Sequence, residues 1–168
     1  MHPIIQVDNL NVRITTPAGI VTAVNGVSFS VDPGEIVGLV GESGSGKSMT
    51  ALAVMRLQPA AAEVSGRVAF DGQDLLSIPA EVMGHLRGSA ISIVFQDPLS
   101  YLNPVMRVGA QIAEAIRIHR NVSARDAREQ TLEVLHKVNI PSPPRAFDAY
   151  PHELSGGMRQ RALIAMAV

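Results

Sequence analysis

A glycine-rich stretch between an apolar run and a helical pattern constrains the fold of this chain more than any other feature. Residues 36–40 read Ile-Val-Gly-Leu-Val, and a continuous apolar run predicts a strand buried on both faces of a sheet. Residues 41–48 follow directly and match G-x-x-x-x-G-K-[ST], and residues 49–57 then read as a helix. A strand, a glycine loop and a helix in this order predict an α/β protein.

The glycine loop predicts a phosphate-binding site. Its glycines let successive main-chain N–H groups turn inward, and the positive end of the following helix adds to the field that attracts an anion. We expect Lys47 to contact the β- and γ-phosphates and the hydroxyl of Ser48 to bind Mg²⁺. The alternative, a flexible turn with a solvated lysine, would make the flanking strand and helix coincidental. The residues expected around the phosphates are Gly41, Glu42, Ser43, Gly44, Ser45, Gly46, Lys47 and Ser48.

The rest of the first half of the chain is strand-like. Alternation of apolar and polar residues over residues 27–31 predicts a half-exposed strand. Residues 66–70 predict another strand, and the Asp-Gly pair that follows them predicts a tight turn. Residues 91–95, Ile-Ser-Ile-Val-Phe, predict a further buried strand.

The second half of the chain is mostly helical. Apolar residues recur at helical spacing over residues 105–119, and Ser123 with Asp126 resembles a capping box that opens another helix. The last helix should begin near Ser155. Its apolar pattern reaches Val168 without the glycine, asparagine or basic residue that usually ends a helix, so we interpret the chain as cut within an element.

Composition excludes several classes of protein. The chain has 168 residues, enough for one domain with a core, and 14 basic against 15 acidic residues, so it lacks the basic surface of a nucleic-acid-binding protein. It has no cysteine, which excludes a disulfide framework and a cysteine nucleophile and fits the cytosol. No apolar run approaches the roughly 20 residues of a membrane-spanning helix, and the first residues do not resemble a secretion signal.

The glycine loop and two further motifs resemble those of one protein family. Residues 154–161, Leu-Ser-Gly-Gly-Met-Arg-Gln-Arg, resemble the signature of ATP-binding cassette (ABC) proteins, and residues 94–98 resemble their Q-loop. With the glycine loop, they stand in the order and at the spacing of that family. Arg159 and Arg161 are expected to form surface salt bridges. More narrowly, the chain is similar to ATPase subunits of bacterial dipeptide, oligopeptide and nickel importers in residues 95–100, 102–104, 109, 111–112 and 150–153.

The resemblance implies an ATP- and Mg²⁺-dependent ATPase that works as a head-to-tail dimer. In this family the signature of one subunit faces the glycine loop of a second subunit, so Ser155, Gly156 and Gly157 would bind the γ-phosphate through N–H groups at a helix start. Gln96 would reach Mg²⁺ or the attacking water, and Lys47 and Gln96 would be catalytic. The alternative for Ser155 is an ordinary N-cap serine, and the alternative for Gln96 is a polar residue at the end of a strand.

The implied fold is a P-loop NTPase core with a parallel sheet, a small antiparallel β subdomain and a helical subdomain. We expect the core and β subdomain over residues 1–96, the helical subdomain over residues 97–154 and the signature helix over residues 155–168. Residues 97–106 would contact an integral-membrane permease at the cytoplasmic face of the cell membrane, and a solute-binding protein would act indirectly. The resemblance leaves open whether the solute is a peptide or nickel, and whether the dimer is homo- or heterodimeric.

The chain departs from the family pattern in two ways. Family members usually stack adenine on an aromatic ring where this chain has Ile14, so a π contribution of about 0.5 to 1.5 kcal/mol would be missing. The alternative is that Ile14 is a core residue. The Walker B strand, with its Asp and catalytic Glu, is absent from the sequence. Residues 70–72 imitate its start, but they carry a turn signal in place of the Glu and predict a hairpin. We therefore expect a truncated cassette that binds ATP better than it hydrolyses ATP. Without the Walker B strand, the strands next to it in the parallel sheet would lose a neighbour. We therefore expect these strands and the apolar face of residues 162–168 to be exposed.

Two rival interpretations belong to other classes. One is a soluble, non-transport ABC ATPase for DNA repair or translation, although the short span between the glycine loop and the signature leaves no room for a long coiled coil. The other is a non-enzymatic nucleotide-binding module.

Overall fold

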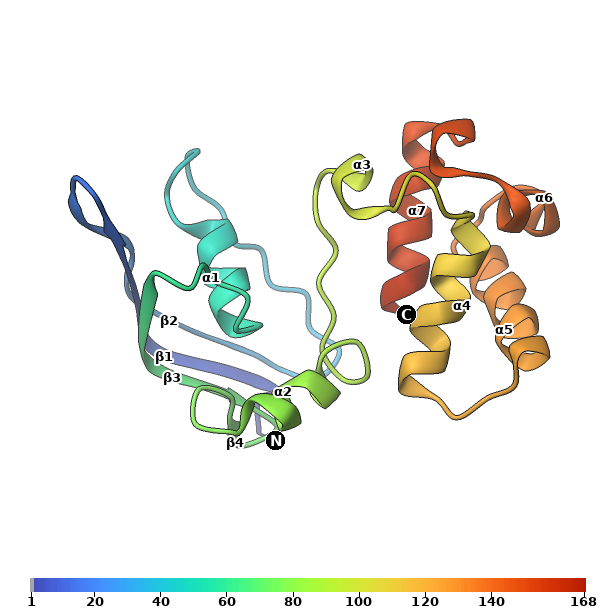
Figure 1. Cartoon of the computed structure of the whole chain (residues 1–168). Coiled ribbons are helices and arrows are strands. Elements are labelled where there is room, and N and C mark those ends of the chain that lie inside the picture. The colour runs from blue at the N-terminus through green and yellow to red at the C-terminus, as the bar shows by residue number, and fades with distance from the viewer. Residues whose placement is uncertain (1) are drawn as a thin grey trace. The chain divides into compact units, whose positions relative to one another are not determined.

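The computed structural model describes residues 2–168, with the side chain of residue 99 left out, and it contains two compact units. The first unit extends to Gly84 and holds a sheet and a helix, and the second unit, His85–Val168, is mostly helical (Figure 1). The short helix α2 (Ala80–Leu86) contains the boundary between the units.

The sheet of the first unit is wholly antiparallel. It contains β1 (Ile5–Thr16), β2 (Gly19–Val31), β3 (Ala62–Phe70) and β4 (Gln73–Asp74) in the order β2-β1-β3-β4. The tight turn predicted after residue 70 joins β3 to β4 as a hairpin. The fully buried side chains of β1 and β3 are Val7, Leu10, Val12 and Val68, and the regular alternation of β1 is interrupted by a register shift between Val7 and Leu10.

Helix α1 (Lys47–Val54) packs on β1 and β2 through Thr50, Ala53 and Val54, which are its buried residues. Arg56 fixes the chain just after this helix. Its guanidinium donates hydrogen bonds to the carbonyls of Leu75 (3.1 Å) and Ile78 (2.7 Å). The helix that follows the glycine loop is therefore anchored at its far end to the segment after β4.

The two strands predicted to be buried are not formed among the described residues, so this part of the prediction is wrong. Residues 36–40 are irregular, and Ile36 and Val40 are 97% and 90% exposed. Residues 91–95 form only a single bridge, between Arg87 and Ile91. A buried parallel strand needs neighbouring strands on both sides, and the four strands of the described sheet pair only with one another. The parallel sheet of the expected core is thus missing from residues 2–168.

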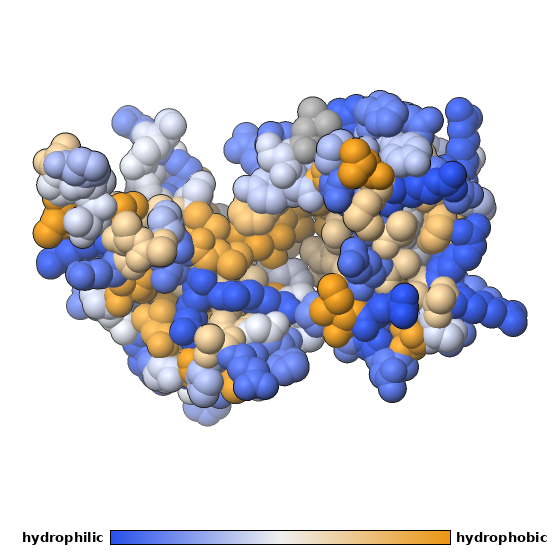
Figure 2. Space-filling view, viewed as in Figure 1, coloured by the Kyte–Doolittle hydropathy of each residue, from blue (hydrophilic) through white to orange (hydrophobic). Residues whose placement is uncertain are grey.

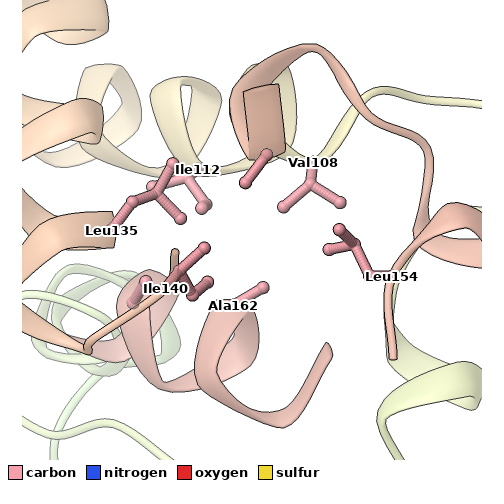
Figure 3. Close-up of a cluster of buried hydrophobic side chains, with 8 residues drawn as sticks. Val108, Ile112, Leu135, Ile140, Leu154 and Ala162 are labelled. Carbon is pink, nitrogen blue, oxygen red and sulfur yellow. The ribbon is translucent and has the colours of Figure 1, made fainter. Parts of the chain in front are cut away.

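The second unit is a bundle around one apolar core. Its helices are α3 (Pro98–Tyr101), α4 (Val108–His119), α5 (Ala124–Lys137), α6 (Pro143–Asp148), the 3₁₀ helix η1 (Pro151–Glu153) and α7 (Gly156–Ala167). The cap predicted for α5 is confirmed, because Ser123 Oγ accepts a hydrogen bond from the main-chain N–H of Asp126 at 3.1 Å. The side chains that meet in the core, drawn in Figure 3, come from α4, α5, α6, α7 and the loops between them, and include Val108, Ile112, Leu135, Ile140, Leu154 and Ala162.

Helix α7 is covered by this bundle more fully than the sequence suggested. Ala162 and Ala165 are buried in the core, so the prediction of an exposed apolar face over residues 162–168 is wrong for these positions. Ile164 and Val168 are exposed, as predicted. Figure 2 shows other apolar side chains at the surface of both units, interspersed with hydrophilic ones. Within residues 2–168, no helix combines the length and the apolar character that crossing a bilayer requires.

Candidate functional site

The glycine loop has a backbone that only glycine accommodates at two of its positions. Gly44 and Gly46 have φ angles of 84° and 91°, in the left-handed region that side chains disfavour. Gly46 is also crowded, because a Cβ atom there would lie 2.3 Å from the carbonyl oxygen of Ala23. Gly46 is the N-cap of α1, so the strained residue marks the point where the loop becomes a helix.

Lys47 folds back over the loop. Its ammonium donates hydrogen bonds to the carbonyl oxygens of Gly41 (2.8 Å) and Glu42 (2.6 Å) and lies 3.4 Å from Ser45 Oγ. A lysine ammonium has three donors on a flexible stem. In this arrangement the oxygens nearest the ammonium all belong to the loop itself.

The start of α1 suits an anion. Its N-cap is a glycine, so no side-chain hydrogen bond caps the first turn, and no acidic residue lies in that turn. The first N–H groups of a helix have no partner within the helix and carry the positive end of its dipole. Ser48 is exposed in the same turn, where its hydroxyl can reach a ligand. The loop and the helix start together provide what binding a phosphate chain requires.

The signature residues lie at the start of α7. Ser155 is the N-cap, and its Oγ accepts from the N–H of Met158 at a long 3.4 Å. Gly156 and Gly157 are exposed, and neither has a positive φ angle. A Cβ atom at either position would meet nothing within 4 Å. The described residues therefore give no conformational or steric reason for glycine at positions 156 and 157, unlike position 46.

Gln96 lies in an irregular segment of the second unit, with its side chain exposed. The residues on both sides of it are anchored. Phe95 stacks on Tyr101 with ring centroids 4.0 Å apart, and Asp97 accepts a hydrogen bond from Ser100 Oγ at 2.6 Å. No strand ends at Gln96, so the alternative of a polar residue closing a strand does not apply to this structure.

The residues expected to bind Mg²⁺ are Ser48 and Gln96, which lie in different units. Their hydroxyl and amide oxygens are suitable donors for Mg²⁺. The described residues contain no cluster of three or more His, Cys, Asp or Glu side chains that could hold a metal ion. Each residue taken by itself supplies one neutral oxygen, which fits an ion held chiefly by phosphate oxygens and water, as Mg²⁺ commonly is.

Ile14, at the position expected to face adenine, lies on β1 between Val21 of β2 and Ala62 of β3. It is half-buried. Part of its side chain therefore remains accessible to solvent.

Sequence reasoning assigned no role to Gln111, which organises the segment after Gln96. Gln111 is 6% exposed, and its amide makes three main-chain hydrogen bonds. Oε1 accepts from Asn103 N–H at 2.9 Å, and Nε2 donates to the carbonyls of Asn103 and Met106, both at 3.0 Å. The signal was a polar residue on the apolar face of the α4 pattern.

Arg107 forms a second link within this unit. Its guanidinium lies 3.2 Å from Asp148 Oδ1 and 6.0 Å from the ring centre of Tyr150. A hydrogen bond with Tyr150 and then the charge of Asp148 raise the pKa of Arg107 above its ordinary value, so this side chain stays charged. Both members of the ion pair are about half exposed, at 54%, so the pair stabilises the fold little.

The fold resembles solved nucleotide-binding structures. It superposes on the post-hydrolysis state of the dimeric ATP-binding cassette MJ0796 bound to ADP and Pi with a TM-score of 0.84 and 25% identity, over 98% of this chain and 68% of that one. Another dimeric structure of MJ0796, described as a bacterial ABC transporter cassette, gives a TM-score of 0.83 and 26% identity, again over 98% and 68%. The predicted fold class, that of an ATP-binding cassette with a small antiparallel sheet and a helical part, is thus confirmed, although the parallel sheet is not formed within residues 2–168.

Sequence comparison gives the same result. The family model for ABC transporters matches residues 24–168, and the chain therefore belongs to the ABC transporter family. It is 44% identical to the oligopeptide transport ATP-binding protein OppD of Haemophilus influenzae, over 100% of this chain and 52% of the relative. For OppD of Escherichia coli the values are 46%, 98% and 49%, and for OppD of Mycobacterium bovis 50%, 100% and 28%. The chain spans about half, or less, of the length of these relatives.

Proposed function

We propose that this chain is the ATP-binding part of an ABC importer that couples the binding and hydrolysis of ATP to the uptake of peptides. The observation that carries the proposal is the pair of glycines at the start of α7. Gly156 and Gly157 are exposed, helical and uncrowded, so glycine there serves close approach by something outside the chain. A triphosphate held on the glycine loop of a second subunit would make that approach.

The names of the relatives favour a peptide over nickel as the solute. The similar proteins are oligopeptide transport ATP-binding proteins, and others are putative peptide import ATP-binding proteins from Brucella. These names also favour transport over the soluble rivals in DNA repair or translation. The MJ0796 structures, which are dimeric, support a subunit that works in pairs.

In the proposed mechanism the residues of this chain hold ATP and orient the reaction. Lys47 would exchange the carbonyls of Gly41 and Glu42 for β- and γ-phosphate oxygens. Ser48 and Gln96 would each offer an oxygen to Mg²⁺, which would supply positive charge against the phosphate oxygens. N–H groups at residues 155–157 of the second subunit would stabilise the γ-phosphate from the opposite side. Gln96 would orient the attacking water.

The segment at residues 97–106 is the proposed contact with a permease at the cytoplasmic face of the membrane, with a solute-binding protein acting indirectly. Tyr101 and Val105 are 48% and 79% exposed, whereas Leu102 is buried. Exposed apolar side chains on a segment braced by Gln111 suit a protein contact.

The test is the substitution Lys47→Ala in the full-length protein, with binding of a fluorescent ATP analogue as the readout. Because Lys47 is the positively charged side chain proposed to contact the phosphates, we expect the affinity to fall about tenfold or more, the equivalent of roughly 1.4 kcal/mol. Lys137→Ala, which removes an exposed lysine from α5, is the matched control and should bind normally. Equal affinity of the Lys47 and Lys137 variants would contradict the proposal.

A further inference from the structure

Arg159 ties the turn before the signature to the signature helix. Its Nε donates a hydrogen bond to the carbonyl of Pro151 at 2.7 Å, and a terminal nitrogen lies 3.4 Å from the carbonyl of His152. The expectation of a surface salt bridge is therefore wrong for Arg159, whose hydrogen bonds go to main-chain carbonyls of η1. Arg161 likewise donates to a carbonyl, that of Asn139.

Arg159 makes hydrogen bonds both to the turn before the signature and to the N-cap residue of the signature helix. Its main-chain N–H donates to the carbonyl of Ser155 at 3.0 Å, which begins the helix, while its side chain reaches back to η1. Residues 154–157 lie between these two attachments. Losing the side chain would leave the helical bond intact and remove the bond to η1.

The accepting carbonyl lies in a well-ordered turn. Pro151 is fully buried, and its carbonyl also accepts a hydrogen bond from the N–H of Leu154 at 3.2 Å. The N–H of Tyr150 donates to the Glu153 carboxylate at 2.7 Å. Leu154 points into the core beside Val108, as Figure 3 shows. The turn thus has a fixed apolar anchor, and Arg159 sets the direction in which the chain leaves that anchor.

We propose that Arg159 is a positioning residue for the nucleotide-facing segment at residues 155–157. It fixes η1 against α7 and thereby the direction of the exposed N–H groups that follow Ser155. This inference rests on the proposed function, in which these groups bind the γ-phosphate of a second subunit. Arginine suits the task because its planar fork can reach two adjacent carbonyls, which a lysine ammonium contacts only as a single point.

The test compares Arg159→Ala, Arg159→Lys and Arg128→Ala in the full-length protein assembled with its second subunit. Two quantities are measured for each variant: the affinity for an ATP analogue and the turnover of ATP at saturation. Arg128→Ala is the matched control, because it removes an arginine contact of the same unit, 4.2 Å from the ring centre of Phe147, that does not involve residues 151–157. Thermal unfolding of all variants is recorded alongside.

We expect Arg159→Ala to keep its affinity for ATP within about twofold and to lose turnover by about tenfold or more, since small misplacements of an orienting group can cost up to about 100-fold. Arg159→Lys should fall between this variant and the wild type, and Arg128→Ala should turn over ATP normally. Wild-type turnover in Arg159→Ala would overturn the inference, as would an equal loss in Arg128→Ala at equal thermal stability. If the wild type binds ATP but neither associates with the second subunit nor hydrolyses ATP, the proposed function fails as well.

Discussion

Glycine serves opposite purposes at position 46 and at position 157. Gly46 is required by its own fold, because its φ is 91° and a Cβ would press on the Ala23 carbonyl. Gly157 is exposed and helical, so alanine fits there without strain. We predict that Gly157→Ala leaves stability unchanged or raises it by up to about 1 kcal/mol, as expected for Gly to Ala in a helix. The same variant should weaken ATP-dependent dimerisation, because a methyl group in a close contact costs about 1–3 kcal/mol.

Gly46→Ala is the contrasting variant in this experiment. It should lower stability by at least about 1–2 kcal/mol, because the left-handed conformation disfavours a side chain even before the clash is counted. Denaturant unfolding measures stability, and light scattering with ATP measures association. The interpretation of Gly157 is refuted if Gly157→Ala destabilises the isolated subunit as Gly46→Ala does, since the glycine would then serve the chain's own fold.

Gln111 joins helix α4 to the segment before it. Replacing it by alanine leaves the N–H and carbonyl of Asn103 and the carbonyl of Met106 without this partner. We predict a loss of about 1–3 kcal/mol of stability, the usual cost of buried polar groups left unsatisfied. Gln130→Ala, which removes one bond with the exposed Arg120, should cost less than about 0.5 kcal/mol. Hydrogen exchange at residues 103–106 should accelerate only in the Gln111 variant; equal protection in both variants would contradict the bracing role.

Elements governed by local rules were predictable from the sequence. The cap at Ser123, the hairpin after residue 70 and the helix that begins after Ser155 each depend on residues close together in the chain, and all three are present. The glycine loop was found by its pattern, but the attachment of Arg159 to Pro151 was not. A side chain that bonds to a main-chain carbonyl eight residues away leaves no compositional signal, so only the geometry of the turn reveals it.

Strand pairing depends on segments that are distant in the chain. The apolar runs at residues 36–40 and 91–95 have the composition of buried strands, yet a strand exists only where another backbone pairs with it. In residues 2–168 the two runs lack such a pairing, apart from the bridge at Ile91. The apolar composition of these segments indicated that their side chains favour burial. Whether the segments form strands depended on the presence of another strand to pair with.

The exposure of residues 36–40 can be tested in the 168-residue chain itself. Ile36 and Val40 are 97% and 90% exposed, so replacing both with threonine should change the free energy of unfolding by less than about 0.5 kcal/mol. The same double variant should bind less of a dye that reports exposed apolar surface, because it removes two uncovered side chains. Val68→Ala, at a fully buried position of β3, should instead cost about 1–3 kcal/mol and serves as the comparison. A loss of stability in the double variant as large as that in Val68→Ala would mean that residues 36–40 are buried in this chain, and hence that they find a partner strand within it.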